Sequence, residues 1–394
     1  MTGVFPDVRR YFPEREPARH RSAGVPWAPP FTKDCPMRPL VATVDLAAIL
    51  HNHALAKGCA PQARAFALVK ANAYGHGVRE VVTALHDEAD GFAVACLEEA
   101  AEVRALHSRA RILLLEGCFE PAEYQLAAHL GLDVAVQGVE QAEALLDAEL
   151  ERPLKLWLKL DSGMHRLGFS APDLRDWHAR LQGARQVAEL NLMSHFACAD
   201  EPNHPLTAQQ LEHFQSLADL PFAGRSLANS AAILSLPQAH LDWLRPGIML
   251  YGASPFAGRD AAALGLQPAM TLTAQLIAIR EVPAGETVGY GATWRAGRPT
   301  RIGTVSCGYA DGYPRNAPAG TPLAINGRRA PLAGRVSMDM LTVDLSELPE
   351  ARVGDPVELW GAGLPVDEVA RACGTIGYEL LTRVTARVPR RYRF

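Results

Sequence analysis

The chain has 394 residues, of which 48% are hydrophobic, and a formal net charge of -4 at pH 7. This length has room for two domains and a large core, and the sequence has no basic stripe that would indicate a nucleic-acid partner. Its apolar stretches are too short to span a bilayer, so we also expect no membrane partner.

Seven cysteines are scattered along the chain, an odd number without any C-x-x-C pair. This pattern argues against a disulfide framework or a zinc site, and it favours a reducing compartment. The sequence contains neither an H-E-x-x-H motif nor a G-x-x-x-x-G-K-[ST] phosphate loop. We therefore expect a cytoplasmic protein that holds no metal.

Residues 1–36 interleave prolines with arginines and lack the apolar segment of a secretory signal. Such a segment buries little surface, so we expect a disordered N-terminal extension and assign it no function. Met37-Arg38-Pro39-Leu40 begins a globular pattern, which is compatible with an alternative start at Met37.

Over residues 37–268, short apolar runs alternate with alanine-rich helical stretches such as 98–107 and 139–150. Eight such alternations predict an α/β fold, a TIM-like (β/α)8 barrel. A doubly wound Rossmann sheet is the alternative, which is weakened because no G-x-G-x-x-G follows the first strand. The predicted strands cover residues 66–69, 92–95, 112–115, 134–136, 154–160, 190–193, 226–228 and 242–244.

Beyond Gln267-Pro268 the pattern changes to extended pieces and turns, which predicts a C-terminal β-domain over residues 269–394. Asn326-Gly327 is a hairpin signal within it. An early strand over residues 40–46 is a candidate to join this domain. The predicted strands are 272–280, 301–306, 322–325, 340–345 and 356–359.

Lys70 ends the first apolar run of the barrel, and Gly75 and Gly77 allow a tight turn before a helix that begins near Val78. A partly desolvated lysine loses its proton more readily and can attack a carbonyl carbon, which suits Schiff-base chemistry. Taken alone, a lysine at a strand end is more often a surface lysine that reaches solvent. Its surroundings decide between these interpretations.

Other notable polar or glycine positions also fall at or just after predicted strand ends. The C-terminal ends of barrel strands share one face, so these residues should converge on one mouth. This coincidence favours an active site over separate solvated loops. The positions are Lys70, Lys159, Asp161, His195, Asn229, Ser230, Arg245, Gly247 and Ile248.

The stretch VKANAYGHG at residues 69–77 closely resembles the cofactor-lysine motif of alanine racemases. The resemblance extends over residues 37–394, and it rests on several motifs that occur in order. It implies an isomerase that interconverts L-alanine and D-alanine, supplying D-alanine for peptidoglycan or degrading it. The other motifs are WLKLDSGMHR (157–166), SHF (194–196), NS (229–230), RPGI (245–248), YG (251–252), GYGA (289–292), GYADG (308–312) and GRVSMD (334–339).

The resemblance implies pyridoxal 5'-phosphate as the cofactor, carried by Lys70, with His195 and Asn229 among the residues that bind it. Hydroxyl and backbone N–H groups at strand-to-helix turns suit its phosphate. Local sequence alone leaves open that some of these are buried structural residues, His195 and Tyr378 in particular. The implied phosphate ligands are Tyr74, Ser230, Gly247, Ile248 and Tyr378.

Racemisation removes the Cα proton from one face and returns a proton to the other, so two bases are expected. By the resemblance, Lys70 is the base for D-alanine and Tyr290 is the base for L-alanine. A phenol is a weak base at neutral pH, and His195 and Arg245 would favour its ionised form or relay its proton. Arg166 would orient Tyr290 and the substrate.

By the same resemblance, Arg245 is expected to face the pyridine nitrogen of the cofactor. Because arginine keeps its proton, the ring nitrogen would stay unprotonated, which favours reprotonation at Cα over transamination. Lys159 resembles a family lysine that is often found as a carbamate. Carbamylation would convert its repulsion of Arg166 into attraction.

Tyr290, Tyr309, Met338 and Asp339 lie in the predicted second domain. In the family they approach the barrel mouth of the partner subunit, which implies a head-to-tail homodimer with shared active sites. Tyr309, Met338 and Asp339, with Arg166, would bind the substrate.

Two other functions stay open. A pyridoxal-phosphate-dependent amino-acid decarboxylase can share the architecture, but it would need a carboxylate in place of Arg245. A non-enzymatic pyridoxal-phosphate carrier built on the barrel would leave the β-domain without a role.

Overall fold

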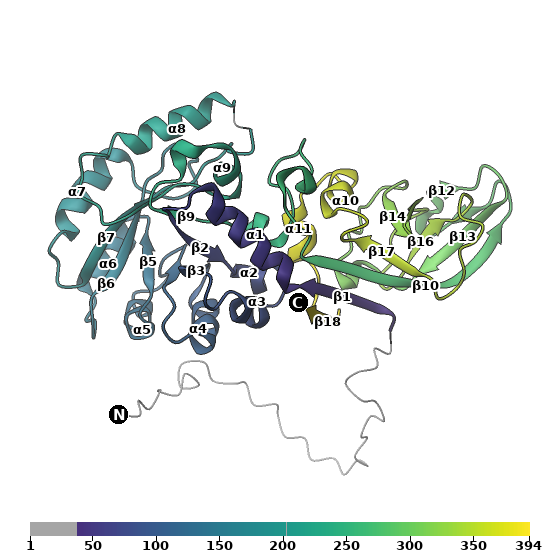
Figure 1. Ribbon diagram of the computed structural model, residues 1–394, viewed down its shortest axis with the longest axis horizontal. Coiled ribbons are helices and arrows are strands. Elements are labelled where there is room, and N and C mark those ends of the chain that lie inside the picture. The colour runs from purple at the N-terminus through teal and green to yellow at the C-terminus, as the bar shows by residue number, and fades with distance from the viewer. Residues whose placement is uncertain (1–37, 202) are drawn as a thin grey trace, which may run out of the picture. The chain divides into compact units, whose positions relative to one another are not determined.

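A computed structural model describes residues 38–201 and 203–394 (Figure 1), and the expectations for residues 1–36 lie outside the described residues. Arg38–Phe394 form one compact unit, so the division at residue 268 stays a prediction. No helix in the described part of the chain is long and apolar enough to cross a membrane.

Eight parallel strands form a sheet in the order β8-β7-β6-β5-β4-β3-β2-β9. The two edges meet where the N–H of Arg245 donates to the carbonyl of Ala228 at 3.0 Å, beside a bridge between Asn229 and Arg245. The predicted (β/α)8 barrel is therefore confirmed, and the Rossmann alternative is wrong. The strands are β2 (Arg64–Leu68), β3 (Gly91–Val94), β4 (Ile112–Leu114), β5 (Asp133–Val136), β6 (Leu154–Lys159), β7 (Val187–Met193), β8 (Arg225–Ser226) and β9 (Trp243–Leu244).

Helices lie on the outside of these strands (Figure 1). Local signals fix where several of them begin. At the start of the helix Leu46–Cys59, the carboxylate of Asp45 accepts the N–H of Ala48 at 3.0 Å. At the start of the helix Ala171–Leu181, Ser170 Oγ accepts the N–H of Asp173 at 3.2 Å. The helices are α1 (Leu46–Cys59), α3 (Val78–Ala84), α4 (Leu97–Leu106), α5 (Glu123–Leu130), α6 (Val139–Asp147), α7 (Ala171–Leu181), α8 (Pro205–Gln215) and α9 (Ser230–Ser235).

The barrel interior is filled by an aromatic layer that includes Phe66, Trp157 and Trp243. Phe66 stacks on Trp243 with ring centroids 4.1 Å apart. Arg111, which precedes β4, lies 4.8 Å from the Trp243 ring centroid and donates to the Asp133 carboxylate at 2.7 Å. Because both charged residues lie at the N-terminal ends of strands, this ion pair closes the base of the barrel.

A second eight-stranded sheet, mostly antiparallel, is built around the long strand β10, and β1 pairs with both β10 and β18. The predicted hairpin at Asn326-Gly327 is confirmed, since both residues have positive φ and join two paired strands. The elements are β1 (Leu40–Asp45), β10 (Met270–Val282), β13 (Thr300–Val305), β14 (Pro322–Ile325), β15 (Arg328–Pro331), β16 (Leu341–Asp344), β17 (Pro356–Trp360) and β18 (Arg390–Arg393), a two-stranded ribbon of β11 (Thr287–Val288) and β12 (Trp294–Arg295), and helices α10 (Val366–Ala372) and α11 (Gly377–Thr382).

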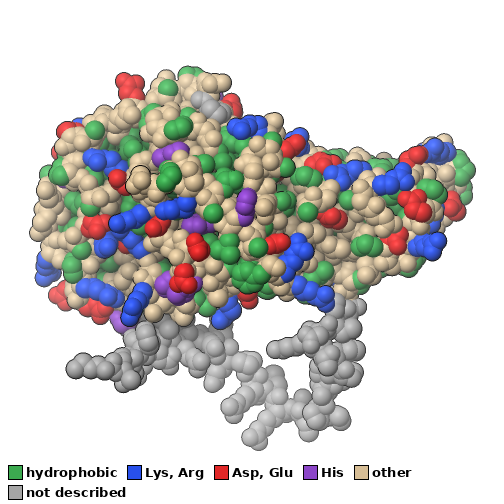
Figure 2. All heavy atoms as spheres, in the orientation of Figure 1, with side chains coloured by type: hydrophobic (Ala, Val, Ile, Leu, Met, Phe, Trp, Pro, Cys, Tyr) green, Lys and Arg blue, Asp and Glu red, His purple; other side chains and the backbone are tan. Residues whose placement is uncertain are grey.

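Charged side chains of both signs are interspersed over the face drawn in Figure 2, in keeping with the small net charge of the sequence. On this face, the described residues offer a polyanion no extended basic track.

Candidate active site

Lys70 stands directly beyond β2 at the C-terminal mouth of the barrel, where it is half-buried. The chain then makes a left-handed turn, α2 (Lys70–Tyr74), in which the four residues from Ala71 to Tyr74 all have φ between 52° and 54°. Left-handed backbone costs a residue with a side chain roughly 1–2 kcal/mol. Strain of this kind, held in place by its surroundings, is typical of functional sites.

Three polar side chains hold this turn. The Glu99 carboxylate accepts the N–H groups of Ala71 at 2.7 Å and Ala95 at 2.9 Å, which ties the turn to the end of β3. Asn72 Oδ1 accepts the N–H of Val78 at 2.9 Å. From the C-terminal region, Arg390 donates to the carbonyl of Gly75 at 2.7 Å. These contacts offset the backbone strain and fix the position of Lys70.

Lys70 lines a cavity of about 690 Å³ at the barrel mouth. Eleven of the sixteen residues expected at the site line this cavity, although they come from five strand ends and from α11. They are Lys70, Tyr74, Lys159, Arg166, His195, Asn229, Ser230, Arg245, Gly247, Ile248 and Tyr378.

One end of the cavity gathers hydroxyl and N–H donors. Ser230 Oγ accepts the N–H of Gly247 at 2.9 Å, so the segments after β8 and β9 are joined there. Burial raises the pKa of the Tyr74 and Tyr378 phenols, which keeps both protonated as donors at neutral pH. The first N–H groups of the 3-10 helix that begins at Ile248 have no acceptor within that helix. This end therefore suits a phosphate.

Arg245 is buried, and its guanidinium is held from within the barrel. It donates to Ser226 Oγ and to the backbone carbonyls of Ser194 and Leu227. Burial lowers the pKa of Arg245 to about 10, which still leaves it positively charged at neutral pH. The site thus presents a fixed donor that does not give up its proton.

Positive charge dominates the cavity, which contains Lys70, Lys159, Arg166 and Arg245 against the carboxylates of Glu116 and Glu379. Such an excess of positive charge suits an anionic ligand.

Burial, reinforced by the charges of Arg245 and Arg166, lowers the pKa of the Lys159 ammonium to about 8. Burial and the same two arginines lower the pKa of His195 well below its usual value. His195 is therefore neutral at pH 7, and Lys159 has an accessible neutral form.

Five expected residues do not line the Lys70 cavity within one chain, and one of them is Asp161, whose Oδ1 instead accepts the N–H groups of Gly163 and His165, each at 3.0 Å. Tyr290 is 69% exposed and lines a separate hollow with Arg335, Ser337 and Met340. Tyr309 lies in a short 3-10 helix, and Met338 and Asp339 lie in a loop hydrogen-bonded to it. Tyr290, Tyr309, Met338 and Asp339 could reach a Lys70 cavity only from another chain or after a rearrangement.

The cavity also contains residues that sequence reasoning missed. Glu116 follows β4 closely, so the strand-end rule that selected Lys159 would have found it. Behind the lining, Tyr251, which was noted only as part of a motif, stacks on Tyr74 with centroids 4.8 Å apart and donates to the carbonyl of Leu68 at 2.7 Å, which orients the Tyr74 ring. Glu379 and Thr382 come with Tyr378 on α11, a helix that the apolar pattern did not indicate.

Two family models match most of the chain: "Alanine racemase, N-terminal domain" over residues 44–255 and "Alanine racemase, C-terminal domain" over residues 269–392. A curated biosynthetic alanine racemase of Pseudomonas aeruginosa is 76% identical over 356 residues, which are 90% of this chain and 99% of that protein.

Solved structures agree with the sequence comparison. The crystal structure of biosynthetic alanine racemase from Pseudomonas aeruginosa superposes with a TM-score of 0.90 at 76% identity, covering 91% of this chain and all of that one. An alanine racemase from Bartonella henselae, described with covalently bound pyridoxal phosphate, gives a TM-score of 0.82 at 30% identity, covering 90% of this chain and 99% of that one.

Proposed function

This chain belongs to the alanine racemase family, and on that premise we propose that it interconverts L-alanine and D-alanine with pyridoxal 5'-phosphate held on Lys70. The observation that carries the proposal is the convergence of eleven residues, distant in sequence, on one cationic cavity around Lys70. The geometry of each part of that cavity suggests what its residues do.

The cavity fits the proposed cofactor at both of its ends. At the phosphate end a Cβ added to Gly247 would lie 2.7 Å from the Tyr74 hydroxyl, so glycine keeps open the space that a phosphate needs. Ser230, Tyr74 and Tyr378 would donate hydroxyl hydrogens to the phosphate oxygens. Asn229 caps α9 through a 3.1 Å bond to the N–H of Ala232 and so fixes the position of Ser230.

At the other end, Arg245 and His195 would contact the pyridine ring. Arg245 would donate a hydrogen bond to the ring nitrogen without protonating it, because its pKa of about 10 lies far above neutrality. A decarboxylase would need a carboxylate beside the ring nitrogen, and the residue that we place there is Arg245. This difference favours racemisation over the decarboxylase alternative.

When bound, pyridoxal phosphate supplies an electron sink that makes the Cα proton of the amino acid acidic. Lys70 Nζ would remove that proton from D-alanine or return one to the same face. Tyr290 Oη of the partner subunit would do the same on the opposite face, as the two-base mechanism of the family requires. Each turnover moves one proton onto one base and one proton off the other, and Arg166 would orient the substrate between them.

A head-to-tail homodimer would complete the site. Tyr290, Met338 and Met340 are 69%, 52% and 43% exposed, and large apolar side chains gathered on a surface often mark an interface. Met338 and Met340 flank Asp339, and the family places Tyr290, Tyr309 and Asp339 at the mouth of the partner's barrel. One chain alone does not bring Tyr290 to its own Lys70 cavity.

Lys159 would be carbamylated in the working enzyme. Its pKa of about 8 gives a neutral amine that can add to carbon dioxide, releasing a proton and leaving a carbamate anion. That anion would neutralise part of the repulsion among Lys159, Arg166 and Arg245. It would also give Arg166 a partner that holds it over the substrate.

The 76% identity to a biosynthetic relative supports D-alanine supply for peptidoglycan as the physiological role. The described cysteines, at positions 59, 96, 118, 198, 307 and 373, are free thiols, which supports a cytoplasmic location.

The test is an assay of purified holoenzyme with L-alanine, in which D-alanine should form and carbon dioxide should not. Lys70→Ala should lose both the visible absorbance of bound cofactor and the activity, whereas Lys155→Ala, an exposed lysine, should keep both. Carbon dioxide release would favour the decarboxylase alternative, and bound cofactor without turnover would favour the carrier alternative. Cofactor absorbance in dialysed Lys70→Ala would place the cofactor lysine elsewhere.

A further inference from the structure

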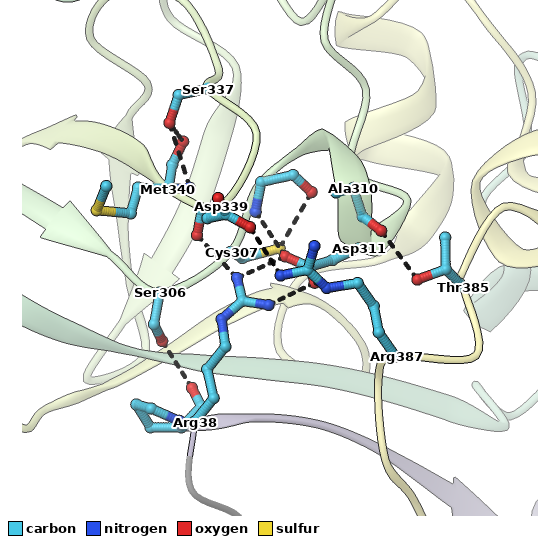
Figure 3. Close-up of polar contacts among 12 residues, drawn as sticks. Arg38, Ser306, Cys307, Ala310, Asp311, Ser337, Asp339, Met340, Thr385 and Arg387 are labelled. Atoms are coloured by element: carbon cyan, nitrogen blue, oxygen red, sulfur yellow. Dashed lines mark hydrogen bonds and ion pairs between the residues drawn. The ribbon is translucent and has the colours of Figure 1, made fainter. Parts of the chain in front are cut away.

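A buried carboxylate ties together three distant parts of the chain beside the segments that carry Tyr309 and Met338 (Figure 3). The Asp311 side chain has no exposed surface, and Arg38 donates to its two oxygens at 2.5 and 2.6 Å. Arg387 Nε lies 3.0 Å from the same carboxylate. One acidic group is thus held by arginines from the two ends of the described chain.

The same two arginines also hold Asp339. Arg387 Nη2 donates to Asp339 Oδ1 at 2.7 Å, and Arg38 Nη2 donates to the Asp339 backbone carbonyl at 2.8 Å. The hydrogen bond to Asp311 raises the pKa of Arg38, so this guanidinium is charged at every relevant pH. Both arginines therefore connect the buried Asp311 to the loop that contains Asp339.

Backbone hydrogen bonds join the two segments to each other as well. Asp311 Oδ2 accepts the N–H of Gly308 at 2.9 Å, which closes the turn around Tyr309. The N–H groups of Tyr309 and Ala310 donate to the carbonyls of Ser337 and Met338, each at 3.0 Å. A shift of the Asp311 carboxylate would therefore move Tyr309 and Met338 together.

We propose that Asp311 is a positioning residue: clamped by Arg38 and Arg387, it sets the placement of Tyr309, Met338 and Asp339 and thereby the affinity for alanine. This inference rests on the proposed function, in which those three residues complete the Lys70 cavity of the partner subunit. Arg38, Asp311 and Arg387 do not line the Lys70 cavity, so the clamp would act on the substrate through Tyr309, Met338 and Asp339 and would leave the cofactor ligands unchanged.

The test is Asp311→Asn in the holoenzyme. The amide keeps the shape of the side chain but replaces one oxygen with an N–H donor that faces an arginine. Loss of a hydrogen bond to a charged group should raise KM for alanine about tenfold or more, with kcat changed much less. Cofactor absorbance should be unchanged, because the cofactor ligands lie elsewhere.

Asp133→Asn is the matched control, since Asp133 is also buried and also paired with an arginine, at the base of the barrel. It should lower the melting temperature without raising KM. If Asp311→Asn lowers only the melting temperature, as the control does, Asp311 is merely structural and the inference is wrong. That outcome would leave the proposed function standing, provided that the wild-type chain racemises alanine and Lys70→Ala does not.

A second variant keeps the inference testable if Asp311→Asn does not fold. Arg387 is 42% exposed, and Arg387→Met would leave the two Arg38 contacts on Asp311 in place while freeing the Asp339 carboxylate. It should raise KM severalfold and lower the melting temperature less than Asp311→Asn does, because Arg38 still pairs with the buried carboxylate. An unchanged KM in Arg387→Met, with racemisation intact, would overturn the inference.

Discussion

The hydroxyl of Tyr74 lies 2.7 Å from the point that a Cβ on Gly247 would occupy. The Tyr74 ring cannot easily give way, because it stacks on Tyr251 and its backbone belongs to the left-handed turn after Lys70. The two residues therefore fix the width of the phosphate end of the cavity, and this leads to the first prediction.

Gly247→Ala should weaken cofactor binding while the protein stays folded. Forcing one methyl group into a packed site costs about 1–3 kcal/mol, which corresponds to roughly 5- to 150-fold in the dissociation constant. Titration of the apoenzyme with pyridoxal phosphate would measure it. Gly258→Ala is the control, since a Cβ at Gly258 meets nothing within 4 Å. Equal affinities in the two variants would place the phosphate elsewhere.

Tyr290→Phe should separate the two faces of the reaction. The side chain is 69% exposed and the change removes only its oxygen, so stability should hardly alter. Racemisation should fall about 10²–10⁴-fold in both directions, the usual effect of losing a positioned base. Exchange of the Cα proton in D₂O should survive better for D-alanine, which Lys70 can still deprotonate. Equal loss of exchange from both enantiomers, with cofactor bound, would contradict the assignment of two bases.

Mixing Lys70→Ala with Tyr290→Phe should restore activity that neither variant has alone. If each site combines Lys70 of one chain with Tyr290 of the other, every mixed dimer has one intact site and one doubly defective site. Random reassortment makes half of the dimers mixed, so about a quarter of wild-type activity should return. A mixture that stays inactive after subunit exchange is verified by mass spectrometry would mean that each chain builds its site alone.

Carbamylation of Lys159 should increase with pH at constant dissolved carbon dioxide. Carbon dioxide adds to the neutral amine, and the neutral fraction grows as the pH rises toward the lowered pKa of about 8. A carbamate signal in ¹³C NMR with labelled carbon dioxide should therefore be stronger near pH 8 than near pH 6, and Lys159→Gln should remove it. The signal persisting in Lys159→Gln would assign it to another amine.

Much of the barrel could be predicted because its strands are local apolar runs with distinct ends. Even β8 and β9, each only two residues long, fell within or beside their predicted ranges. Once the barrel was inferred, the strand-end rule placed Lys159, His195 and Arg245 at one mouth without any knowledge of contacts. Pairings made between distant segments were harder to foresee. The parallel pairing of β1 with β18, 348 positions apart at Asp45 and Arg393, has no local signal.

Two features of the site were beyond sequence reasoning for physical reasons. The residues Ala-Asn-Ala-Tyr after Lys70 favour a right-handed helix, whereas in the fold their left-handed turn is held by Asn72 within it and by Glu99 and Arg390 from distant parts of the chain. The isolation of Tyr290 from the Lys70 cavity depends on tertiary placement, which a motif cannot reveal.

The aromatic layer of Phe66, Trp157 and Trp243, together with the Arg111–Asp133 ion pair, closes the barrel at the N-terminal ends of its strands. Substrate must therefore enter the Lys70 cavity through the C-terminal mouth of the barrel, and product must leave through the same opening. For mirror-image reactants of equal size and charge, arrival and departure then compete for one passage. An inhibitor that binds at this opening would block both directions of the reaction to the same degree.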